Sequence, residues 1–440
     1  MLHGLLVVLV FLSFAARITL SGETAAPTPD DYKRLAAEAE AHLQKHILKL
    51  WFPRSLDKER GGFIQDYSED WTEKRDGNKT LVYQARLTWT AAQVALSFPE
   101  LAKEYTAYSN HGLDFLADKM WDKENGGFFW SVDANGKPTG ERKNEKHVYG
   151  ISFGLYAASV NFKATKNPRA LELANKTFTW LQEHSHDTAH GGYFEALTTS
   201  GTTILQPPTN GAESDYIGTR YGFKSMNSHI HLLESMTAYN EVVGTHAPQL
   251  KELFEIVRDK ICVKPGCMHL YFNPDWTPVP DLDSFGHDIE TAYLLVEAGE
   301  ELKLHNDPAS EHMSRALVDH SLGFGWDKDR GGFYNEGATF RKVFDKEKIW
   351  WVQAEGLNAL LLMHEKYGKE TGKYWNAFLK QWDFIQKNQL DAKNGGWIST
   401  VSEDGHSKPG QVKSDQWKEC YHQGRAMINV IERLKKMAGK

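Results

Sequence analysis

The sequence predicts an all-α fold, an (α/α)6 barrel of six helical hairpins with short β-hairpin excursions at one rim. Three observations support this prediction: a motif that recurs about every 65 residues, paired segments with helical periodicity between its copies, and a final repeat as rich in functional groups as the middle ones. A fixed period of this kind is the signature of a repeat architecture.

The repeated motif consists of Asp, a short polar run, Gly-Gly and an aromatic residue. Its copies are DKERGGF at 57–63, DKENGGF at 122–128, DTAHGGY at 187–193, DKDRGGF at 327–333 and DAKNGGW at 391–397. The gap between the third and fourth copies is close to two periods and holds a degraded copy at 267–276, so six units fill the chain. Gly-Gly suits a turn with positive φ, and the following aromatic can fill the space between two helices.

Each unit is predicted to hold two helices. In the unit between 81 and 127, both LVYQARLTWTAAQVALSF and LAKEYTAYSNHGLDFLADKMW place apolar residues at helical spacing. Alternating residues and a Gly- or Asn-containing turn after Gly-Gly predict a short β-hairpin. Six such units form either an open solenoid or a closed ring. An open solenoid needs polar capping repeats, whereas the last segment, YHQGRAMINVIERL, carries functional groups, which favours closure.

The N-terminal region, residues 1–26, is predicted to be a signal peptide and short linker, followed by a single barrel domain over residues 27–440. Its apolar run from Leu5 to Ala16 is too short to span a bilayer as a helix. Small and polar residues follow it, as in a secretory signal. A buried N-terminal helix is the alternative. We therefore expect an exported protein, secreted or periplasmic, without stable membrane insertion.

Charge and cysteine content narrow the class of protein. The net charge is −7 and no Lys/Arg-rich patch stands out, which argues against a nucleic-acid partner. Three cysteines, Cys262, Cys267 and Cys420, cannot all pair, so the chain is not a disulfide scaffold. A Cys262–Cys267 bridge stays open at this point. We expect a monomer or weak dimer with a small-molecule partner.

Functional side chains recur at a common phase of the repeat. Four of them follow a Gly-Gly pair by 20 to 26 residues, and a fifth follows at a larger distance because its repeat carries an insertion: Arg86, His147, Glu355, His422 and, after the insertion, His231. In a closed ring of repeats, residues at the same position within each repeat lie at the same height along the barrel axis. These side chains should therefore converge on one rim. Helical spacing of three or four residues adds three pairs: His287 with Glu290, Trp351 with Glu355, and Asn227 with His231.

Structural roles are the alternative for each of these residues. A single histidine in an apolar helix, such as His147 or His229, is usually a satisfied core residue, and Arg86 or the His287–Glu290 pair can form a buried ion pair. Burying so many such groups at one phase for structure alone is costly, which favours a functional site.

This residue set suits proton transfer at a carbon next to a carbonyl. One neutral imidazole removes the proton and a second returns it on the opposite face, since the ordinary pKa of histidine, ~6.5, lies near working pH. An arginine can stabilise the ene-diolate oxygens. The sequence shows no metal-ligand spacing and no nucleotide loop, so neither a metal nor another cofactor is expected, and its 14 Trp, 17 Tyr and 22 Phe suit sugar stacking. A glycoside hydrolase using Glu290 and Glu355 would leave the histidines unexplained; a non-catalytic sugar-binding protein is a further alternative.

Five blocks carry a family resemblance. KHVYGISFGLYA, KSMNSHIHLLES, FGHDIETAYLLVEA, KIWWVQAEGLNALL and WKECYHQGRAMIN resemble, in order, the signatures of the N-acylglucosamine 2-epimerase superfamily, and most of all its cellobiose 2-epimerase branch. The resemblance runs from about residue 35 to the C-terminus. It implies inversion of C2 in the reducing-end glucose of β-1,4-linked disaccharides, cellobiose to glucosyl-mannose or lactose to epilactose, without a cofactor. An aldose–ketose isomerase or N-acylglucosamine 2-epimerase acting on a monosaccharide is the alternative.

The resemblance also implies roles for individual residues. The implied catalytic residues are His287 and His422 on opposite faces of C2, Glu290 and Glu355 orienting them and assisting ring opening, Arg86 on the sugar oxygens, and His231 as a third histidine. The implied substrate-binding residues are Tyr149, Asn227, Tyr293, Trp350, Trp351 and Trp417. The sequence departs from the family at Tyr293, where some members have Trp, and at Glu419–Cys420, where relatives often have Cys-Pro.

Overall fold

The computed structural model describes residues 26–74, 77–208, 212–280, 282–304, 307–339 and 343–439. The predicted signal peptide lies outside the described residues, which take in only the last residue of the 1–26 segment. No helix within the described ranges is long and apolar enough to cross a membrane.

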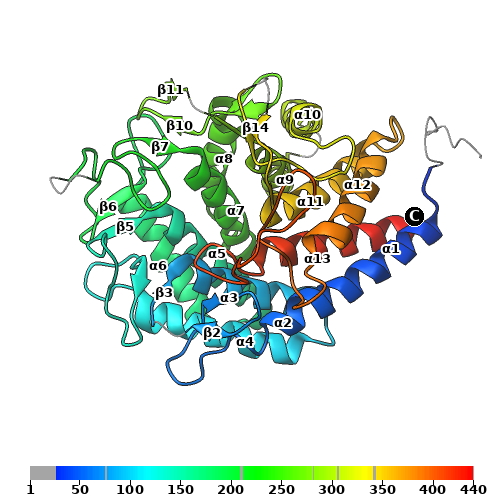
Figure 1. The fold of residues 1–440 in the computed structure, drawn as a ribbon. Helices are drawn as coiled ribbons and strands as arrows, with labels where there is room; N and C mark the ends of the chain where they lie inside the picture. The colour runs from blue at the N-terminus through cyan, green and yellow to red at the C-terminus, as the bar shows by residue number, and fades with distance from the viewer. Residues whose placement is uncertain are drawn as a thin grey trace, which may run out of the picture.

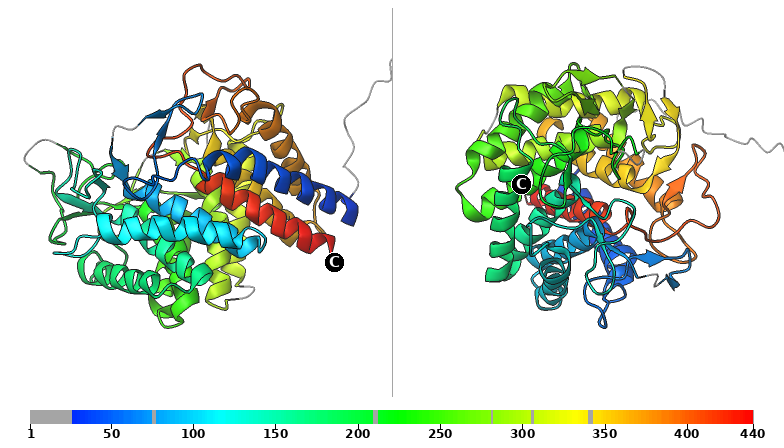
Figure 2. Two further views of the ribbon diagram at one scale, coloured as in Figure 1. Left: turned by 90° about the horizontal axis from the view of Figure 1, so that it is seen from below. Right: turned by 90° about the vertical axis from the view of Figure 1, so that its left-hand side faces the viewer.

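Two concentric rings of helices form the fold, which confirms the predicted (α/α)6 barrel (Figures 1 and 2). The inner helices are α3 (Leu81–Ser97), α5 (Val148–Thr165), α7 (Met226–Val243), α9 (Phe285–Glu301), α11 (Trp350–Tyr367) and α13 (Tyr421–Ala438). The outer helices are α1 (Pro29–His42), α4 (Ala102–Phe115), α6 (Pro168–His184), α8 (Ala247–Ile256), α10 (Pro308–Phe324) and α12 (Lys373–Phe384). One-turn helical segments extend some outer helices: η1 (Leu43–Leu48), α2 (Lys49–Trp51), η2 (Leu116–Met120), η3 (Val257–Ile261) and η4 (Ile385–Gln389).

The ring is closed because α13 packs against both α11 and α3. On its outer side α13 lies along α1, so the first and last helices of the described chain are side by side, blue and red in Figures 1 and 2. Inner helices are buried nearly all round, since each has two ring neighbours and an outer helix; in α5 every residue from Val148 to Asn161 is buried. Outer helices bury one face, and α1, α6 and α10 begin after a side-chain N-cap, Thr28, Asn167 and Asp307 respectively.

Short antiparallel strands lie where the inner helices begin. They are β1 (Asp66–Tyr67), β2 (Glu73–Lys74), β3 (Lys79–Thr80), β4 (Ser131–Val132), β5 (Glu145–His147), β6 (Ala196–Thr198), β7 (Lys224–Ser225), β8 (Cys262–Val263), β9 (Cys267–Met268), β10 (Tyr271–Phe272), β11 (Pro278–Val279), β12 (Asp283–Ser284), β13 (Glu336–Gly337), β14 (Val343–Asp345), β15 (Lys348–Ile349) and β16 (Thr400–Val401). The strand before one inner helix pairs with the strand after the next repeat's turn, as β3 does with β4 and β15 with β16. A bridge between Tyr67 and Ser414 completes this cycle between the first and last repeats.

The Gly-Gly turn is held by a buried ion pair that sequence analysis did not predict. In each of the five copies the Asp accepts from a lysine of the segment that precedes the following inner helix: Asp57–Lys79, Asp122–Lys146, Asp187–Lys224, Asp327–Lys348 and Asp391–Lys413. Lys348 is typical, with Nζ 2.7 Å from Asp327 Oδ2 and 2.8 Å from the Gly331 carbonyl. In the sixth repeat the β8–β9 hairpin replaces the turn, so the degraded copy lies between Cys262 and Met268 and not at 267–276 as predicted. Asp283 occupies the position of the lysine, two residues before the inner helix.

Removing one of these lysines should be costly. We expect Lys348→Met to lower the free energy of unfolding by about 3–5 kcal/mol, because the buried carboxylate of Asp327 loses its cation. The matched control is Lys387→Met, whose exposed pair with Asp383 should be worth less than about 1 kcal/mol. Urea denaturation of both variants measures the difference. Equal losses in the two variants would contradict this account of the repeat.

Three inner helices fasten the aromatic residue after Gly-Gly through a side chain. Gln84 accepts from the backbone N–H of residue 63 and Gln353 from that of residue 333. His229 does the same in the third repeat: its Nε2 accepts from Tyr193 N–H at 2.9 Å, and its Nδ1 donates to the Ser225 carbonyl at 2.7 Å. His229 is therefore a satisfied core histidine, and burial lowers its pKa to about 4.

This histidine should make stability pH-dependent. Its pKa is about 4 in the folded chain and ~6.5 when unfolded, so its contribution to stability is fully present above pH ~6.5 and is lost as pH falls toward 4. His229→Gln, which installs the residue of the other two repeats, removes this dependence. Between pH 6 and pH 5 the free energy of unfolding of the variant should improve by about 1 kcal/mol relative to the parent. Urea denaturation of both proteins at pH 6 and pH 5 checks this. If the difference in free energy of unfolding between variant and parent is the same at both pH values, the prediction is refuted.

Candidate active site

A cavity of about 350 Å³ opens at the end of the barrel where the inner helices begin. Ten of the twelve predicted site residues line it: Arg86, Tyr149, Asn227, His231, His287, Glu290, Trp350, Trp351, Trp417 and His422. Most of them occupy the first two turns of an inner helix, as equal phase in the repeat predicts. Tyr216 and Ile217, from the insertion in the third repeat, complete the wall.

An arginine that sequence analysis did not single out lies at the centre of the site's polar network. Arg425 donates through one terminal nitrogen to Glu234 at 2.6 Å, and through the other to Glu355 at 2.6 Å and to Glu290. Each of the four side chains is at most 1% exposed. The signal was available in YHQGR, because Arg425 is three residues after His422 and shares its helical face.

The three cavity histidines have different hydrogen-bond partners. His422 Nδ1 lies 2.8 Å from Glu355, and His231 Nδ1 lies 2.9 Å from Glu234. His287 Nδ1 lies 2.7 Å from the hydroxyl of Ser284, and not on Glu290 as a buried His287–Glu290 pair would require. Two of the histidines are thus tied to the Arg425 network, whereas the third has a neutral partner.

Burial keeps these imidazoles neutral. It lowers the pKa of His287 to about 4 and that of His231 to about 3, and it lowers the pKa of His422 well below the usual value. The charge of Glu290 opposes the effect of burial at His422. Near neutral pH the cavity therefore presents uncharged nitrogen bases, the form that can remove a proton from carbon.

Arg86 reaches the cavity wall from α3. It donates to Glu419 at 2.9 Å and to the Tyr149 hydroxyl at 3.2 Å, and its guanidinium carbon lies 4.2 Å from the ring centroid of Phe153. Arg86 thus has the buried carboxylate partner that sequence analysis considered as an alternative, and it lines the cavity as well. Glu419, noted before only as a departure from the family pattern, supplies that partner.

Aromatic rings and unpartnered polar atoms surround the histidines. The ring centroid of Trp351 lies 4.8 Å from that of His287 and 5.5 Å from that of His422, so one indole contacts both. Within the described residues, Asn227 Oδ1 and Trp350 Nε1 are buried without a hydrogen-bond partner. Such atoms in a cavity wall are available to a polar ligand.

Comparison with known proteins identifies the family. The model of the N-acylglucosamine 2-epimerase family matches residues 62–426, most of the chain. The chain belongs to the N-acylglucosamine 2-epimerase family. It is accordingly an enzyme of the carbohydrate epimerase and isomerase class, and it resembles the cellobiose 2-epimerase branch most closely.

Individual members of the family match over nearly their full length. The chain is 30% identical to the cellobiose 2-epimerase of Dictyoglomus turgidum, over 92% of this chain and 100% of the relative. It is 25% identical to the D-mannose isomerase of Marinomonas mediterranea, over 90% and 96%. The solved cellobiose 2-epimerase of Spirochaeta thermophila superposes with a TM-score of 0.80 at 30% identity, covering 93% of this chain and 98% of that one.

Two predicted site residues of this family member lie outside the cavity. Glu355 lies behind His422 as its hydrogen-bond partner. Tyr293 lies one helical turn further along α9 than the cavity residue Glu290 and lines a second cavity together with Glu297, so the structure places it apart from the cavity that the other predicted substrate-binding residues line. The possible Cys262–Cys267 bridge is not formed either, because both are buried free thiols.

In this epimerase-family barrel, losing the central arginine should be severe. Arg425→Met leaves three buried carboxylates without their shared cation, so we expect the free energy of unfolding to fall by at least about 3 kcal/mol. The control is Arg433→Met, two turns further along α13, whose pair with Glu365 is partly exposed and should cost about 1 kcal/mol. Chemical denaturation compares the two variants. A loss at Arg425 no larger than at Arg433 would contradict its central place.

Proposed function

We propose that this enzyme inverts C2 of the reducing-end glucose in β-1,4-linked disaccharides such as cellobiose. The observation that carries the proposal is the pair His287 and His422, which come from different inner helices, line one cavity and contact the same ring, that of Trp351. Two bases on one substrate allow a proton to leave from one face and return on the other. The similarity to cellobiose 2-epimerases supports the disaccharide as substrate.

The reaction begins with ring opening, which exposes a carbonyl at C1 and makes the C2 proton acidic. One imidazole takes that proton, and the electron pair of the C–H bond moves into a C1–C2 double bond, giving an ene-diolate. The other imidazole takes up a proton before this step, against the effect of burial, and delivers it to the opposite face of C2. The C1 carbonyl then re-forms and the sugar becomes mannose. Arg86 is the cavity cation that can stabilise the ene-diolate oxygens.

The hydrogen-bond partners divide the two roles. Burial disfavours the charged form of both imidazoles. His422 is hydrogen-bonded to the Glu355 carboxylate, which stabilises an imidazolium, whereas His287 is hydrogen-bonded to the Ser284 hydroxyl, which does so less. We assign His287 as the base and His422 as the acid in the glucose-to-mannose direction, with the roles exchanged in reverse. Glu290 lines the cavity with one carboxylate oxygen that has no partner among the described residues, so it can accept a hydroxyl proton during ring opening.

The aromatic wall suits a second sugar ring. Trp417 and Tyr149 lie 6.3 Å apart, centroid to centroid, and Tyr216 stacks on Trp130 at 5.3 Å beside them. Stacking faces beyond the two histidines give the non-reducing sugar a place to lie while the reducing end is at the bases. This arrangement favours a disaccharide over a monosaccharide.

The decisive experiment is turnover of cellobiose in D2O. Deuterium should appear at C2 of both recovered cellobiose and glucosyl-mannose, read by NMR and mass spectrometry. His287→Asn and His422→Asn should each lower kcat at least about 10²-fold, because each removes a general acid–base group. The control is His406→Asn, whose side chain is 83% exposed and outside the cavity; its rate should not change.

Three outcomes would refute the proposed function. Full activity in either cavity variant would exclude the two-base mechanism. A ketose product would show that the proton returns to C1, as in an aldose–ketose isomerase. Free glucose from cellobiose would indicate hydrolysis.

A further inference from the structure

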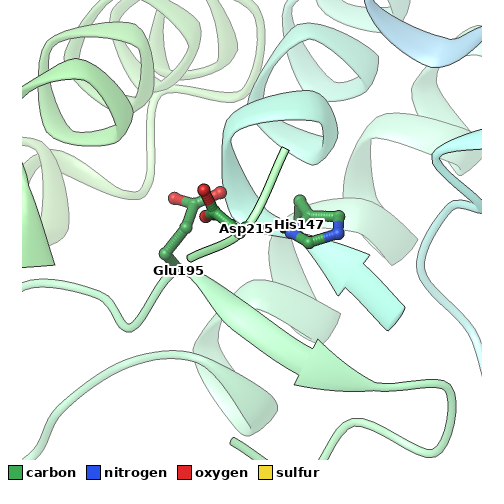
Figure 3. A group of neighbouring side chains, drawn as sticks. All are labelled: His147, Glu195 and Asp215. Carbon is green, nitrogen blue, oxygen red and sulfur yellow. Dashed lines mark ion pairs between the residues drawn. The ribbon is translucent and has the colours of Figure 1, made fainter. Parts of the chain in front are cut away.

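A second group of titratable side chains lies buried just behind the cavity wall. His147 immediately precedes α5, Glu195 follows the third Gly-Gly turn, and Asp215 belongs to the insertion of the third repeat. Their side chains point toward one another in Figure 3, and one ligand atom from each lies within 4.8 Å of the others. None of the three lines the cavity itself.

The imidazole of this group lacks hydrogen-bond partners. His147 is 2% exposed, yet neither of its ring nitrogens has a partner among the described residues. Its Nδ1 is 3.9 Å from Asp215 Oδ2, an oxygen that is also buried and without a partner, and its Nε2 is 3.5 Å from Glu145. Burying an imidazole in this state is costly, so the arrangement indicates a ligand between these atoms.

Glu195 is held in a fixed orientation beside that imidazole. One carboxylate oxygen accepts from the Tyr149 backbone N–H at 3.1 Å, and the other accepts from the Ser228 hydroxyl. Hydrogen bonds of this kind orient the carboxylates that ligate metal ions, and a carboxylate with one donor on each oxygen still has free lone pairs.

The local charge favours a cation. Glu195 and Asp215 are 3% and 4% exposed, and no ion pair joins either of them to an arginine or lysine in the described part of the chain. Burial raises the pKa of Glu195 to about 7, and it raises that of Asp215, which the charge of Glu195 raises further. The nearby Arg142 donates to the Ser214 carbonyl and only partly offsets this charge.

Two of three comparable groups in the described residues already enclose a cation. The groups around Glu290 and His231 or His422 enclose the guanidinium of Arg425. In the third group, Asp283–Asp288–His320, both carboxylate oxygens of Asp283 lack a hydrogen-bond partner among the described residues, but the imidazole Nδ1 lies 3.1 Å from Asp288. The imidazole of the His147 group, in contrast, is left open on both nitrogens.

We propose that His147, Glu195 and Asp215 bind a divalent transition-metal ion of the Zn²⁺ or Mn²⁺ type. One neutral imidazole and two carboxylates suit such ions, whereas Mg²⁺ and Ca²⁺ prefer oxygen ligands alone. This ion is separate from the reacting groups, for which sequence analysis expects no metal.

The ion would fasten one wall of the cavity. Asp215 directly precedes Tyr216 and Ile217, which line the cavity. His147 lies two residues before Tyr149, which lines it too. An ion bound to both segments would cross-link the insertion of the third repeat to the start of α5. Its loss should loosen the insertion and raise KM more than it lowers kcat.

The test measures metal in the full-length chain purified without a histidine tag. We expect about one equivalent of Zn²⁺ or Mn²⁺ per chain by mass spectrometry after dialysis against the metal, falling below about a tenth in Asp215→Asn and in His147→Gln. EDTA should lower the melting temperature of the parent by at least about 2 °C and leave that of both variants unchanged. The matched control is Asp288→Asn, which alters the Asp283 group. This variant should still bind about one metal ion per chain.

Each contrary result overturns the proposal. A parent chain that binds neither ion at micromolar concentration has no such site. A metal ion that stays bound in both Asp215→Asn and His147→Gln occupies another site. A metal ion that is lost only in Asp288→Asn is bound by the Asp283 group. Metal content is read independently of turnover, so failure here leaves the proposed epimerisation standing.

Discussion

The contact between one guanidinium and three buried carboxylates is the constraint on which this site depends. Arg425 lies where the inner helices converge, and it joins Glu234, Glu290 and Glu355, which come from α7, α9 and α11. Those carboxylates in turn hold His231 and His422. A buried polar network of this kind rigidifies the packed helices and specifies which of their faces meet. The contacts of Arg425 therefore both join α13 to other helices of the ring and hold the carboxylates that orient His231 and His422.

The fold could be predicted because its determinants are local and repeated. Gly-Gly turns and helical periodicity recur at a fixed interval, and equal phase correctly places Arg86, His231 and His422 around one cavity. The ion pairs between the turn Asp and a lysine 21 to 37 residues later were not predicted, because nothing in the local sequence marks a lysine as buried. Arg425 escaped because a single arginine in an amphipathic helix resembles a surface residue.

Two predicted site residues do not line the cavity, for geometric reasons. Tyr293 follows Glu290 on one face of α9, but a rise of 1.5 Å per residue carries it below the floor of the cavity. Glu355 has the right phase yet lies behind His422, since the imidazole of His422 lies between it and the cavity. The sequence could not distinguish the surroundings of His147 from those of His229. The imidazole of His229 is hydrogen-bonded to two backbone groups, whereas that of His147 has no hydrogen-bond partner among the described residues.

The packing of α13 between α11 and α3 bears on biosynthesis. Ribosomes deliver the chain from its amino end, so five inner helices emerge before the segment that carries His422 and Arg425. Until that segment arrives, Glu234, Glu290 and Glu355 have no common counter-ion and the ring has a gap one helix wide. A nascent chain must hold this incomplete arc in solution, which makes the last stage of translation the point at which it is most exposed to misassembly.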